Sequence, residues 1–449
     1  MAMKDNNVCI MGMGYVGLTL AVVMAEKGFN VSGIEINPTT LTKLQNKTPH
    51  FFEQGLEIRL KRVVDKGFLV FYQRIKEIPL AAQPSLFVIT VGTPLGENHK
   101  SQMHMVESVG SEIAQHMPED SLVILRSTVR LGTTRKVVLP LLQKTGKKFS
   151  LAYCPERTLE GKAFEELTKL PQIVGGYTPE DMQRAGDIFH RLTPTVIRVS
   201  SLESAEIIKL LDNSYRDHMF AFGNEVALLC DSVGLDGIEV IRAANLGYER
   251  TNIAMPGFVG GPCLHKDPHI LMDSLTDVGY SPSLIKHGRA LNESISSHVI
   301  AMTLRDLPNL AEVNNLKISI LGLAFKGRPE TDDIRATPAI ELITALRAQF
   351  PNAQIFGQDF AVSDDAIQTL EITPCNLDQS FAQAHLVIVA NNNAKYQWIE
   401  LDELASTMQK PGLVFDVWST LPIDEMQTNI HDVKVRRFGS ATAWSKQND

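Results

Sequence analysis

Two patterns of apolar residues alternate along the first part of the chain. Segments with helical periodicity, such as 16–28 and 105–117, separate short apolar runs rich in β-branched residues. These short runs are typical of buried parallel strands and read NVCIMGM, NVSGIE, FLVFY, SLFVITVGT, SLVILRST and SLAYC. Strand–helix alternation of this kind predicts a doubly wound parallel sheet.

The pattern changes near residue 200 and changes back after residue 311. From Glu203 to about Gly247, and again through the 280s and 290s, the periodicity is helical with few strand signals. Strand–helix alternation then returns with LKISILGLAF, AQIFGQDF, HLVIVAN and GLVFDVW. We therefore predict an α/β fold in which two Rossmann-like doubly wound domains, 1–200 and 312–449, are joined by a helical middle domain over 201–311.

The composition limits the class of partner. The chain has 449 residues, of which 44% are hydrophobic and 21% are charged, and its formal net charge is -8. This acidic balance argues against nucleic acid or an anionic membrane as the main partner. The apolar start VCIMGMGYVGLTLAVVMA follows MAMKDNN, which lacks the positive charge of a signal peptide. We therefore expect no membrane span and a cytoplasmic protein.

The five cysteines are scattered at Cys9, Cys154, Cys230, Cys263 and Cys375. They form no CxxC pair and no metal-ligand spacing with histidine, so we expect neither a disulfide framework nor a metal site. Cysteines in this arrangement fit a reducing compartment.

The segment GMGYVG carries the strongest motif in the chain. Gly12, Gly14 and Gly17 close the first predicted strand and open a helix, and Glu35 ends the second strand. This is the dinucleotide fingerprint, with glycines for the turn and an acid for the ribose hydroxyls. A carboxylate would repel a 2′-phosphate, so the motif favours NAD over NADP. The predicted cofactor residues here are Gly12, Gly14, Tyr15, Val16, Gly17 and Glu35.

Hydroxyl residues follow two further strands, in VGTP and in RSTVRLGTT. Ligands of open α/β sheets bind outside the carboxyl ends of the strands, so Thr93, Ser127 and Thr128 are expected to face cofactor or substrate. An alternative is that they are strand-end turns whose hydroxyls are already satisfied.

One cysteine stands in an unusual setting, MPGFVGGPCLHKDP. Gly260 and Gly261 leave the backbone bare beside Cys263, and Lys266 can bring positive charge near the sulfur. A single cysteine is more often a small, inert core residue, so the rest of the chain must decide between these interpretations.

Three other groups of polar residues are candidates for chemistry. Glu156 and Glu160 would share one face of a helical turn, where they could bind hydroxyls or water, although such spacing often marks a solvated face. Lys326 and Arg328 make a phosphate site or an ordinary charged loop. On the long helix near 203–230, the polar stripe is Glu206, Lys209, Asn213 and Arg216. A surface stripe is its default explanation, yet Lys209 with Asn213 would suit an oxyanion.

Taken together and in this order, these motifs resemble the nucleotide-sugar dehydrogenases, which oxidise UDP-glucose, GDP-mannose or UDP-N-acetylhexosamines at C6. The resemblance covers about residues 6–438. The motifs that carry it are GMGYVG, EQGL, VGTP, STVRLGTT, PERTLEGKAFEEL, AEIIKLLDNSYR, NE, GFVGGPCLHKDP and LGLAFKGRPETDDIRATP.

The resemblance implies an NAD domain, a helical middle that forms a homodimer or a higher oligomer, and a C-terminal domain that binds a UDP-sugar. It implies that two NAD oxidise the C6 alcohol of the sugar to a carboxylate. Hydride loss gives an aldehyde, the Cys263 thiolate adds to it, a second hydride loss gives a thioester, and water releases the acid.

The resemblance also assigns roles to single residues. It implies that Lys209 and Asn213 stabilise the oxyanion, and that Asp267 and Thr128 organise water or the base. Glu156 and Glu160 match the acids of the family's PE motif, with Glu160 the better base candidate. Residues implied to bind the nucleotide sugar are Glu156, Lys209, Asn213, Arg250, Gly260 and Lys326, while Arg335 matches an arginine near the cofactor.

The sequence departs from the family pattern at several positions, which leaves the sugar open. Pro262 precedes the cysteine where relatives usually carry Ser or His, Phe360 stands where a proline is general, and Gln172 replaces a common arginine. PERTLEGK and the DP after Lys266 favour a UDP-N-acetylhexosamine, whereas HKD is similar to the UDP-glucose branch. UDP-glucose and GDP-mannose therefore remain alternatives.

Two other classes of protein are alternatives. A two-electron hydroxyacid dehydrogenase of the 6-phosphogluconate type would need neither Cys263 nor the second α/β domain, so both features argue against it. A sugar-nucleotide-binding protein without activity is disfavoured because the cysteine and its Lys, Asn and Asp partners are all present.

Overall fold

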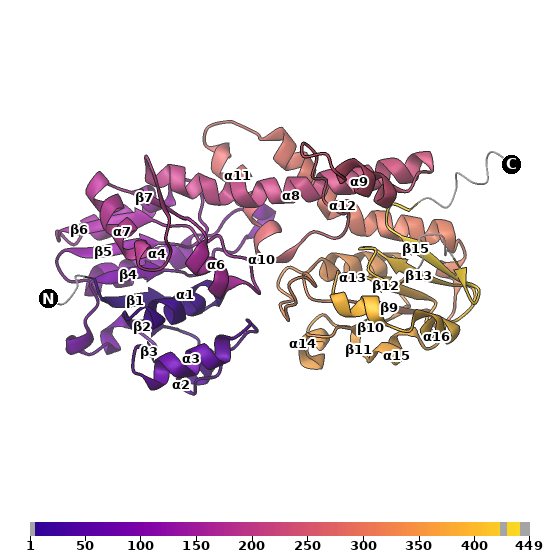
Figure 1. Ribbon diagram of the computed structural model, residues 1–449, viewed down its shortest axis with the longest axis horizontal. Helices are drawn as coiled ribbons and strands as arrows, with labels where there is room; N and C mark the ends of the chain where they lie inside the picture. Colours follow the sequence, from indigo (N-terminus) through magenta and orange to yellow (C-terminus); the bar gives the residue numbers. More distant parts are fainter. Residues whose placement is uncertain (1–4, 423–428, 441–449) are drawn as a thin grey trace. The chain divides into compact units, whose positions relative to one another are not determined.

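A computed structural model of the chain describes residues 5–422 and 429–440. Within them the chain forms two compact units. The first comprises residues up to Asp212 together with His269–Ser281, and the second comprises Asn213–Pro268 and the chain from Pro282 onward. Each unit contains one α/β sheet (Figure 1). The helical segment predicted over 201–311 is divided between the two units.

The sheet of the first unit has the strand order β3-β2-β1-β4-β5-β6-β7-β8. Neighbouring strands are parallel except β6 and β7, which are antiparallel. The strands are β1 (Asn7–Met11), β2 (Asn30–Ile34), β3 (Leu69–Tyr72), β4 (Leu86–Ile89), β5 (Ser121–Leu125), β6 (Phe149–Tyr153), β7 (Gln172–Gly176) and β8 (Val196–Val199). The first six are the predicted ones. The last two were not predicted, because β7 ends in glycines and β8 is half exposed, so neither forms a clear apolar run.

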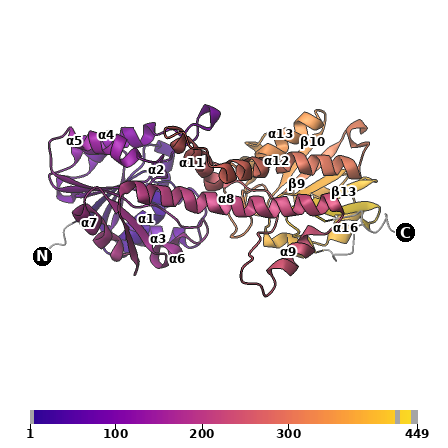
Figure 2. The same ribbon diagram turned by 90° about the horizontal axis from the view of Figure 1, so that it is seen from above.

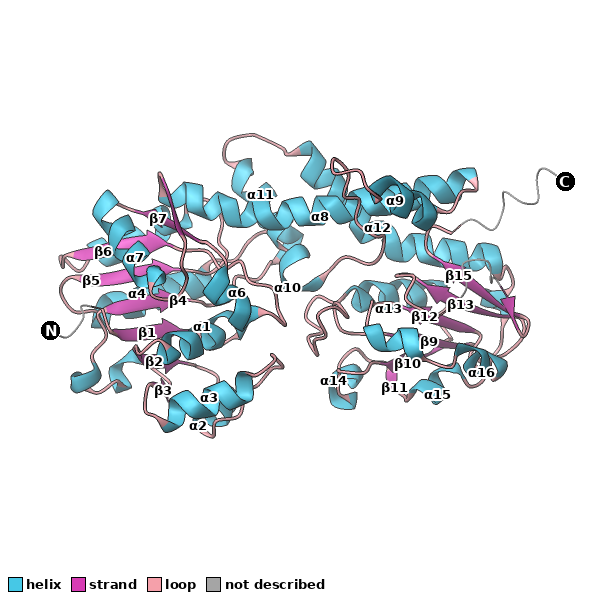
Figure 3. Ribbon diagram, viewed as in Figure 1, coloured by secondary structure: helices cyan, strands magenta, loops and turns pink. Residues whose placement is uncertain are grey.

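Helices cover both faces of this sheet (Figure 3). They are α1 (Tyr15–Glu26), α2 (Pro38–Gln45), α3 (Leu56–Asp65), α4 (His104–His116), α5 (Leu139–Gln143), α6 (Ala163–Lys169) and α7 (Pro179–His190), with 3-10 turns at Ile75–Glu77, Leu80–Ala82 and Glu97–His99 and a π turn at Thr134–Val138. Local sequence fixes where two of the helices begin. The side chain of Asn37 caps α2, and Thr178 and Asp181 form a capping box at the start of α7.

The core of the first unit lies on both faces of its sheet. Along β1, Val8 and Ile10 pack into one buried apolar cluster, and Cys9 and Met11 pack into another. Successive side chains of a strand point to opposite faces, so a strand buried on both faces must be apolar throughout. This explains why the predicted strands read as continuous apolar runs.

The sheet of the second unit has the order β11-β10-β9-β12-β13-β15-β14, with only β14 and β15 antiparallel among its described pairs. Its strands are β9 (Lys317–Leu321), β10 (Gln354–Gln358), β11 (Thr373–Pro374), β12 (Leu386–Val389), β13 (Gly412–Asp416), β14 (Asn429–Ile430) and β15 (Val433–Arg437). The four predicted strands are β9, β10, β12 and β13. The other three were not predicted: β11 and β14 have two residues each, and the charged side chains of β15 interrupt its apolar pattern.

One helix, α8 (Leu202–Val233), is continuous across the division between the units (Figure 2), and α11 (Asp267–Thr276) also spans a division. The remaining helices are α9 (Gly237–Asn245), α10 (Gly261–Leu264), α12 (Ser283–Asp306), α13 (Pro338–Gln349), α14 (Asp364–Gln368), α15 (Leu377–Phe381) and α16 (Leu401–Ser406), with 3-10 turns at Leu310–Glu312 and Ala394–Trp398. Among the described helices, none combines the length and the apolar character needed to cross a membrane.

Both sheets reverse their strand order at one internal position. The reversal lies between β1 and β4 in the first unit and between β9 and β12 in the second. Open α/β sheets bind ligands outside the carboxyl ends of the strands at such a switch point. The two predicted doubly wound sheets are confirmed, and each offers one ligand position built by its own loops.

Candidate functional site

The glycine-rich turn after β1 has the shape that a dinucleotide requires. Gly12 adopts a positive φ of 96°, and a Cβ on Gly17 would lie 1.8 Å from the carbonyl oxygen of Gly12. Only glycine fits at either position. A Cβ on Gly14 would meet no atom within 4 Å, so the backbone there borders open space. The turn therefore leaves a bare approach to the N-terminus of α1, which fits the pyrophosphate of NAD.

Glu35 lies beside this turn, at the end of β2. One of its carboxylate oxygens accepts a hydrogen bond of 3.2 Å from the amide of Met13, and the other accepts one of 2.8 Å from the amide of Asn37. These bonds hold the acid at the carboxyl edge of the sheet, where the fingerprint expects the ribose. The residues present thus fit a bound NAD.

The loops after β4 and β5 are tied together at the switch point. Thr93 Oγ1 donates to the carbonyl of Thr128 at 2.5 Å, and Ser127 Oγ donates to the carbonyl of Val91 at 2.7 Å. The hydroxyls of Thr93 and Ser127 are therefore satisfied by backbone, as the alternative interpretation expected. Their effect is to fix the position of the half-buried Thr128.

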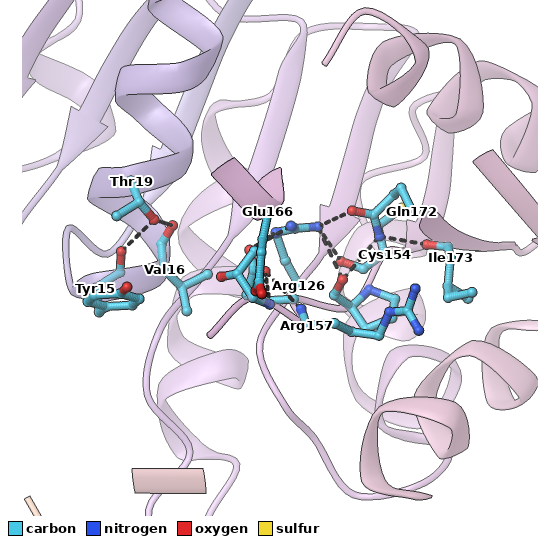
Figure 4. Close-up of polar contacts among 12 residues, drawn as sticks. Tyr15, Val16, Thr19, Arg126, Cys154, Arg157, Glu166, Gln172 and Ile173 are labelled. Atoms are coloured by element: carbon cyan, nitrogen blue, oxygen red, sulfur yellow. Dashed lines mark hydrogen bonds and ion pairs between the residues drawn. The ribbon is translucent and has the colours of Figure 1, made fainter. Parts of the chain in front are cut away.

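Glu156 belongs to a buried polar cluster. Arg126, 2% exposed, donates to Glu156 Oε2 from Nε and Nη2. Its Nη1 donates to Gln172 Oε1 at 2.8 Å (Figure 4). The other Glu156 oxygen accepts from the amides of Arg157 and Thr158. Burial opposes ionisation of Glu156, but Arg126 and the Thr158 bonds outweigh it, so its pKa lies below the ordinary value. Both oxygens are thus engaged by the protein.

Glu160 is placed differently. Residues 154–160 form a loop and α6 starts only at Ala163, so the premise that Glu156 and Glu160 share one face of a helical turn is wrong. The loop is held by Glu53, which accepts hydrogen bonds from the Tyr15 hydroxyl and from the amides of Gly161 and Ala163. Reasoning from single residues missed Glu53, although it opens the EQGL motif.

Three of the four residues of the polar stripe on α8 are buried, contrary to the default expectation of a surface stripe, and only the fourth, Arg216, is exposed. Glu206 is fully buried, and Lys209 and Asn213 are 7% and 6% exposed. On the other side of the helix, Leu211 and Tyr215 are 45% and 65% exposed. Leu211 and Tyr215 therefore face solvent, whereas Glu206, Lys209 and Asn213 face protein.

Glu206 has an unusual environment for a carboxylate. It accepts hydrogen bonds from the amide of Gly132 at 2.5 Å and from the amide and hydroxyl of Thr134 at 2.8 and 2.6 Å. Burial raises its pKa to about 7 even though these bonds favour the charged form. Glu206 thereby anchors the loop that follows Thr128 to α8.

In the second unit, Cys263 is the exposed cysteine of the chain. Burial raises the pKa of the thiols of Cys9, Cys154, Cys230 and Cys375, to about 12 for Cys154 and about 11 for Cys375. A thiolate is the nucleophilic form of cysteine, so those four residues are poor nucleophiles at neutral pH. Cys263, in the short helix α10, is the remaining candidate.

Lys266 and Asp267, which follow Cys263 closely in the sequence, form a hydrogen-bonded chain with Asn213 of α8. Asn213 Nδ2 donates to Asp267 Oδ2 at 2.5 Å, and Lys266 Nζ donates to Asp267 Oδ1 at 2.9 Å. Asp267 is fully buried, and its two oxygens are shared between these donors. The charge of Lys266 is thus paired with Asp267.

The glycine pair before Cys263 is explained by contacts within the protein. A Cβ on Gly260 would lie 2.8 Å from the carbonyl oxygen of Ala336, and Gly261 has a φ of 90° with its Cβ position 2.3 Å from the Phe325 ring. The amide of Gly261 donates to the carbonyl of Ala336 at 2.7 Å. Here the glycines allow the cysteine loop to approach the loop after β9 closely.

The basic residues predicted to bind the nucleotide sugar lie in loops of the second unit. Lys326 follows β9 at the switch point, and its ammonium group lies 5.2 Å from the centre of the Phe325 ring. Arg335 is exposed and makes a bidentate ion pair with Asp333. Arg250 is exposed and lies over the Tyr248 ring at 4.9 Å.

The asparagine-rich loop after β12 was missed by the sequence reasoning. Asn392 Oδ1 accepts from the amide of Gly327, and its carbonyl accepts from Arg328 Nε. The signal was the run NNN directly after a predicted strand. No group of three or more metal-ligating side chains occurs within residues 5–422 and 429–440.

Comparison with known proteins finds three family models that match successive parts of the chain. Three models of the UDP-glucose/GDP-mannose dehydrogenase family match: the NAD binding domain over residues 6–193, the central domain over 203–294 and the UDP binding domain over 319–422. A UDP-N-acetyl-D-mannosamine dehydrogenase of Escherichia coli (strain K12) is 31% identical over 427 residues, which cover 90% of this chain and 97% of that protein.

Two further relatives agree. The UDP-N-acetyl-D-mannosamine dehydrogenase of Campylobacter jejuni is 29% identical, covering 89% of this chain and 98% of that protein. The solved structure of a UDP-D-ManNAc dehydrogenase from Pyrococcus horikoshii superposes with a TM-score of 0.84 at 26% identity, covering 96% of this chain and 99% of that one. With the dinucleotide turn, the exposed cysteine and three matching domain models, the chain belongs to the UDP-glucose/GDP-mannose dehydrogenase family and is an NAD-dependent nucleotide-sugar dehydrogenase.

Proposed function

We propose that this protein oxidises the C6 alcohol of a UDP-N-acetylhexosamine to the uronic acid, using Cys263 as a covalent nucleophile. The observation that carries the proposal is that Cys263 is exposed and is followed by Lys266 and Asp267 of the Lys266–Asp267–Asn213 hydrogen-bond chain, while burial raises the pKa of the other four thiols. The choice of sugar is supported by the relatives named UDP-N-acetyl-D-mannosamine dehydrogenase.

Cysteine chemistry divides the four-electron oxidation into separate steps. The alcohol is first oxidised to the aldehyde, and the Cys263 thiolate adds to the aldehyde carbon to give a thiohemiacetal. Loss of a second hydride gives a thioester, and water then releases the carboxylate and regenerates the thiol. NAD, when bound, accepts the hydride in each oxidation. The sulfur holds the carbon in place between the two oxidations.

Polar residues of α8 and α11 support the charges that develop. Lys209 and Asn213 stabilise the oxyanion, with Asn213 held in place by its hydrogen bond to Asp267. Asp267 and Thr128 organise water for hydrolysis of the thioester. The buried state of Lys209 and Asn213 supports this role, because electrostatic interactions strengthen away from water.

Of the two acids in the PE motif, Glu160 is the better general base. Both oxygens of Glu156 are engaged, by Arg126 on one side and by backbone amides on the other, and its pKa is lowered. A carboxylate whose two oxygens are both engaged and whose pKa is lowered is a weak general base. Glu156 instead fixes the loop in which Glu160 lies, and its part in sugar binding is indirect.

The cofactor is held by the first unit. The turn of Gly12, Gly14 and Gly17 receives the pyrophosphate at the start of α1, where Tyr15 and Val16 lie, and Glu35 binds the ribose hydroxyls. Thr93 fixes the loop of Thr128 beside this site. Arg335 is proposed to add a contact to the cofactor.

The nucleotide sugar is held by the second unit. Lys326 lies in the loop after β9, at the switch point where a ligand of this sheet is expected, and its charge suits a diphosphate. Arg250 supplies a second cation, and the backbone at Gly260 borders the sugar. The family model of the UDP binding domain matches residues 319–422, which include β10 to β13 of this unit's sheet, and supports UDP as the nucleotide.

The protein is also proposed to form a homodimer, through the exposed apolar face of α8. Tyr215, Phe222 and Leu229 recur every seven residues, about two helical turns, and are 65%, 52% and 56% exposed. Large apolar side chains exposed in a row along one side of a helix suit an interaction site, and the second copy of the chain presents the same row. Five cysteines without a disulfide, one of them required as a thiol, support a cytoplasmic location.

The test measures NADH formed per sugar consumed with UDP-GlcNAc, UDP-ManNAc, UDP-glucose and GDP-mannose in parallel. Two NADH per molecule of a UDP-N-acetylhexosamine, and little turnover of the other two, is the expected result. Preference for UDP-glucose or GDP-mannose would move the protein to another branch of the same chemistry. One NADH per sugar would overturn the covalent mechanism.

A further inference from the structure

A buried arginine on α12 contacts the loop that carries Cys263. The Arg289 side chain is 2% exposed, and its Nη1 forms an ion pair of 2.6 Å with Asp217 on α8. Its Nε lies 3.2 Å from Glu293 Oε1, one helical turn further along α12. Buried charges are normally paired in this way. The two acids do not use all of the N–H donors of the guanidinium.

The rest of the guanidinium is directed at the backbone around Cys263. Nη1 donates to the carbonyl of Leu264 at 3.2 Å, and Nη2 donates to the carbonyl of Val259 at 3.2 Å. These two carbonyls lie four residues before the cysteine and one residue after it. A single planar group therefore holds both ends of the short segment in which the thiol sits.

Two asparagines extend this clamp. The side chain of Asn224 on α8 accepts from the amide of Gly257 at 2.8 Å and donates to the carbonyl of Gly257 at 3.1 Å. It also donates to Asn292 on α12. Asn292 in turn donates to the carbonyl and carboxylate of Asp217. The loop is thus fixed at Gly257, Val259 and Leu264 by one connected network between α8 and α12.

We infer that Arg289 is a positioning residue for Cys263, orienting the sulfur through the carbonyls of Val259 and Leu264. This rests on the proposed role of Cys263 as the nucleophile. The guanidinium suits the task because it presents several donors in a rigid plane, whereas a lysine ammonium is a single point charge and cannot reach both carbonyls and Asp217 together. Sub-ångström placement of a nucleophile matters strongly for rate.

The substitution Arg289→Lys tests the inference, with Arg305→Lys as matched control. Arg305 lies on the same helix, is more than half exposed, and pairs with Asp231 away from the cysteine loop. Both changes keep the charge. We expect Arg289→Lys to lower kcat on the UDP-sugar by about tenfold or more with an unchanged KM for NAD, and Arg305→Lys to leave both parameters at the wild-type value.

The measurement that separates a positioning role from a purely structural one is the fate of the aldehyde, which is either captured by the Cys263 sulfur or lost from it. A misplaced sulfur captures the aldehyde poorly, so turnover by Arg289→Lys in the presence of hydroxylamine should trap aldehyde as the oxime and yield fewer than two NADH per sugar. A loss of folded protein lowers kcat but leaves the ratio at two. A folded Arg289→Lys with wild-type kcat, or with a ratio of two, would overturn the inference.

Arg289→Lys strains a buried ion pair. A second variant keeps the inference testable if Arg289→Lys does not fold. The double variant Arg289→Gln/Asp217→Asn removes both charges together and leaves no buried ion without a partner. It should fold and show the same lowered ratio. If neither variant folds, Arg289 is a stability residue and the inference fails. Wild-type enzyme that never reaches two NADH per sugar would instead refute the proposed function itself.

Discussion

Asn213 and Asp267, 54 positions apart, share a hydrogen bond of 2.5 Å between Nδ2 and Oδ2. Both side chains are buried, and the second Asp267 oxygen accepts from Lys266. The bond fixes which way the Asn213 amide points, because its NH₂ group is committed to the carboxylate. Helix α8 and the segment after Cys263 are thereby joined inside the second unit.

Replacing Asp267 by Asn should lower kcat without unfolding the protein. The isosteric amide keeps the volume but loses the charge that pairs with Lys266, and hydrogen bonds to a charged group are each worth about 1.5–3 kcal/mol. We expect kcat to fall about 10- to 100-fold. Steady-state kinetics alongside a thermal melt would check this, and wild-type kcat in Asp267→Asn would remove the residue from the mechanism.

Cys263→Ala should abolish formation of the uronic acid while leaving binding of UDP unchanged. The substitution removes only the sulfur, at an exposed position, so neither fold nor nucleotide binding depends on it. Product formation by mass spectrometry and UDP binding by calorimetry would be compared. Cys375→Ala, a half-buried cysteine of the same unit, is the control and should stay active. Full turnover by Cys263→Ala would refute the covalent mechanism.

Glu35→Ala should weaken NAD binding several-fold. The ribose hydroxyls lose the carboxylate proposed to bind them, and the amides of Met13 and Asn37 lose their acceptors. A net loss of about 1 kcal/mol per hydrogen bond corresponds to about fivefold in affinity. Titration of NADH fluorescence measures it. An unchanged dissociation constant would mean that the acid does not bind the cofactor.

The carboxyl of Glu206 should make the melting temperature depend on pH. Its pKa is raised by burial from 4.5 to about 7 in the folded protein. The folded state therefore retains a proton that the unfolded state has lost, so stability is full below pH 4.5 and decreases as pH rises to about 7. The shift corresponds to about 3 kcal/mol. Nearby charges are Glu203 and Arg135, which pair with each other.

Glu206→Gln removes this titration, because an amide stays neutral throughout. Relative to wild type, its melting temperature should rise between pH 5 and pH 8, as followed by differential scanning fluorimetry. Glu203→Gln is the control: its carboxyl has a pKa lowered by the hydrogen bond from Arg135, so its effect should be constant over the same range. Parallel melting curves for wild type and Glu206→Gln would contradict the prediction.

Phe222→Asp should convert the proposed dimer to a monomer. A charge in the centre of the row formed by Tyr215, Phe222 and Leu229 would be buried without a partner on association. Light scattering after size exclusion gives the mass. Ile58→Asp, at an exposed apolar position on α3, is the control and should keep the wild-type mass. A monomeric wild type would refute the dimer proposal.

Several features of the molecule could be predicted because they depend on residues that are close together in the sequence. The predicted strands of the two sheets appear as apolar runs because they are buried on both faces, and Gly12, Gly14 and Gly17 are spaced as the turn between strand and helix requires. The short, half-exposed strand β8 has no such run and could not be found in the same way.

Only the tertiary structure decided what the polar residues face. The stripe of Glu206, Lys209 and Asn213 has the periodicity of a solvated helix face, yet it is buried because the segments packed against it come from distant parts of the chain. The same holds for Glu156, whose oxygens are occupied by Arg126, and for Arg289 beneath the Cys263 loop.

The sequence by itself determined the two α/β sheets, the NAD fingerprint and the cysteine motif, because these depend on apolar period and short spacing. The fold decided which acid is engaged, which stripe is buried and which residues hold the nucleophile. Those properties depend on hydrogen bonds between residues tens of positions apart, and only the packed chain brings such residues together.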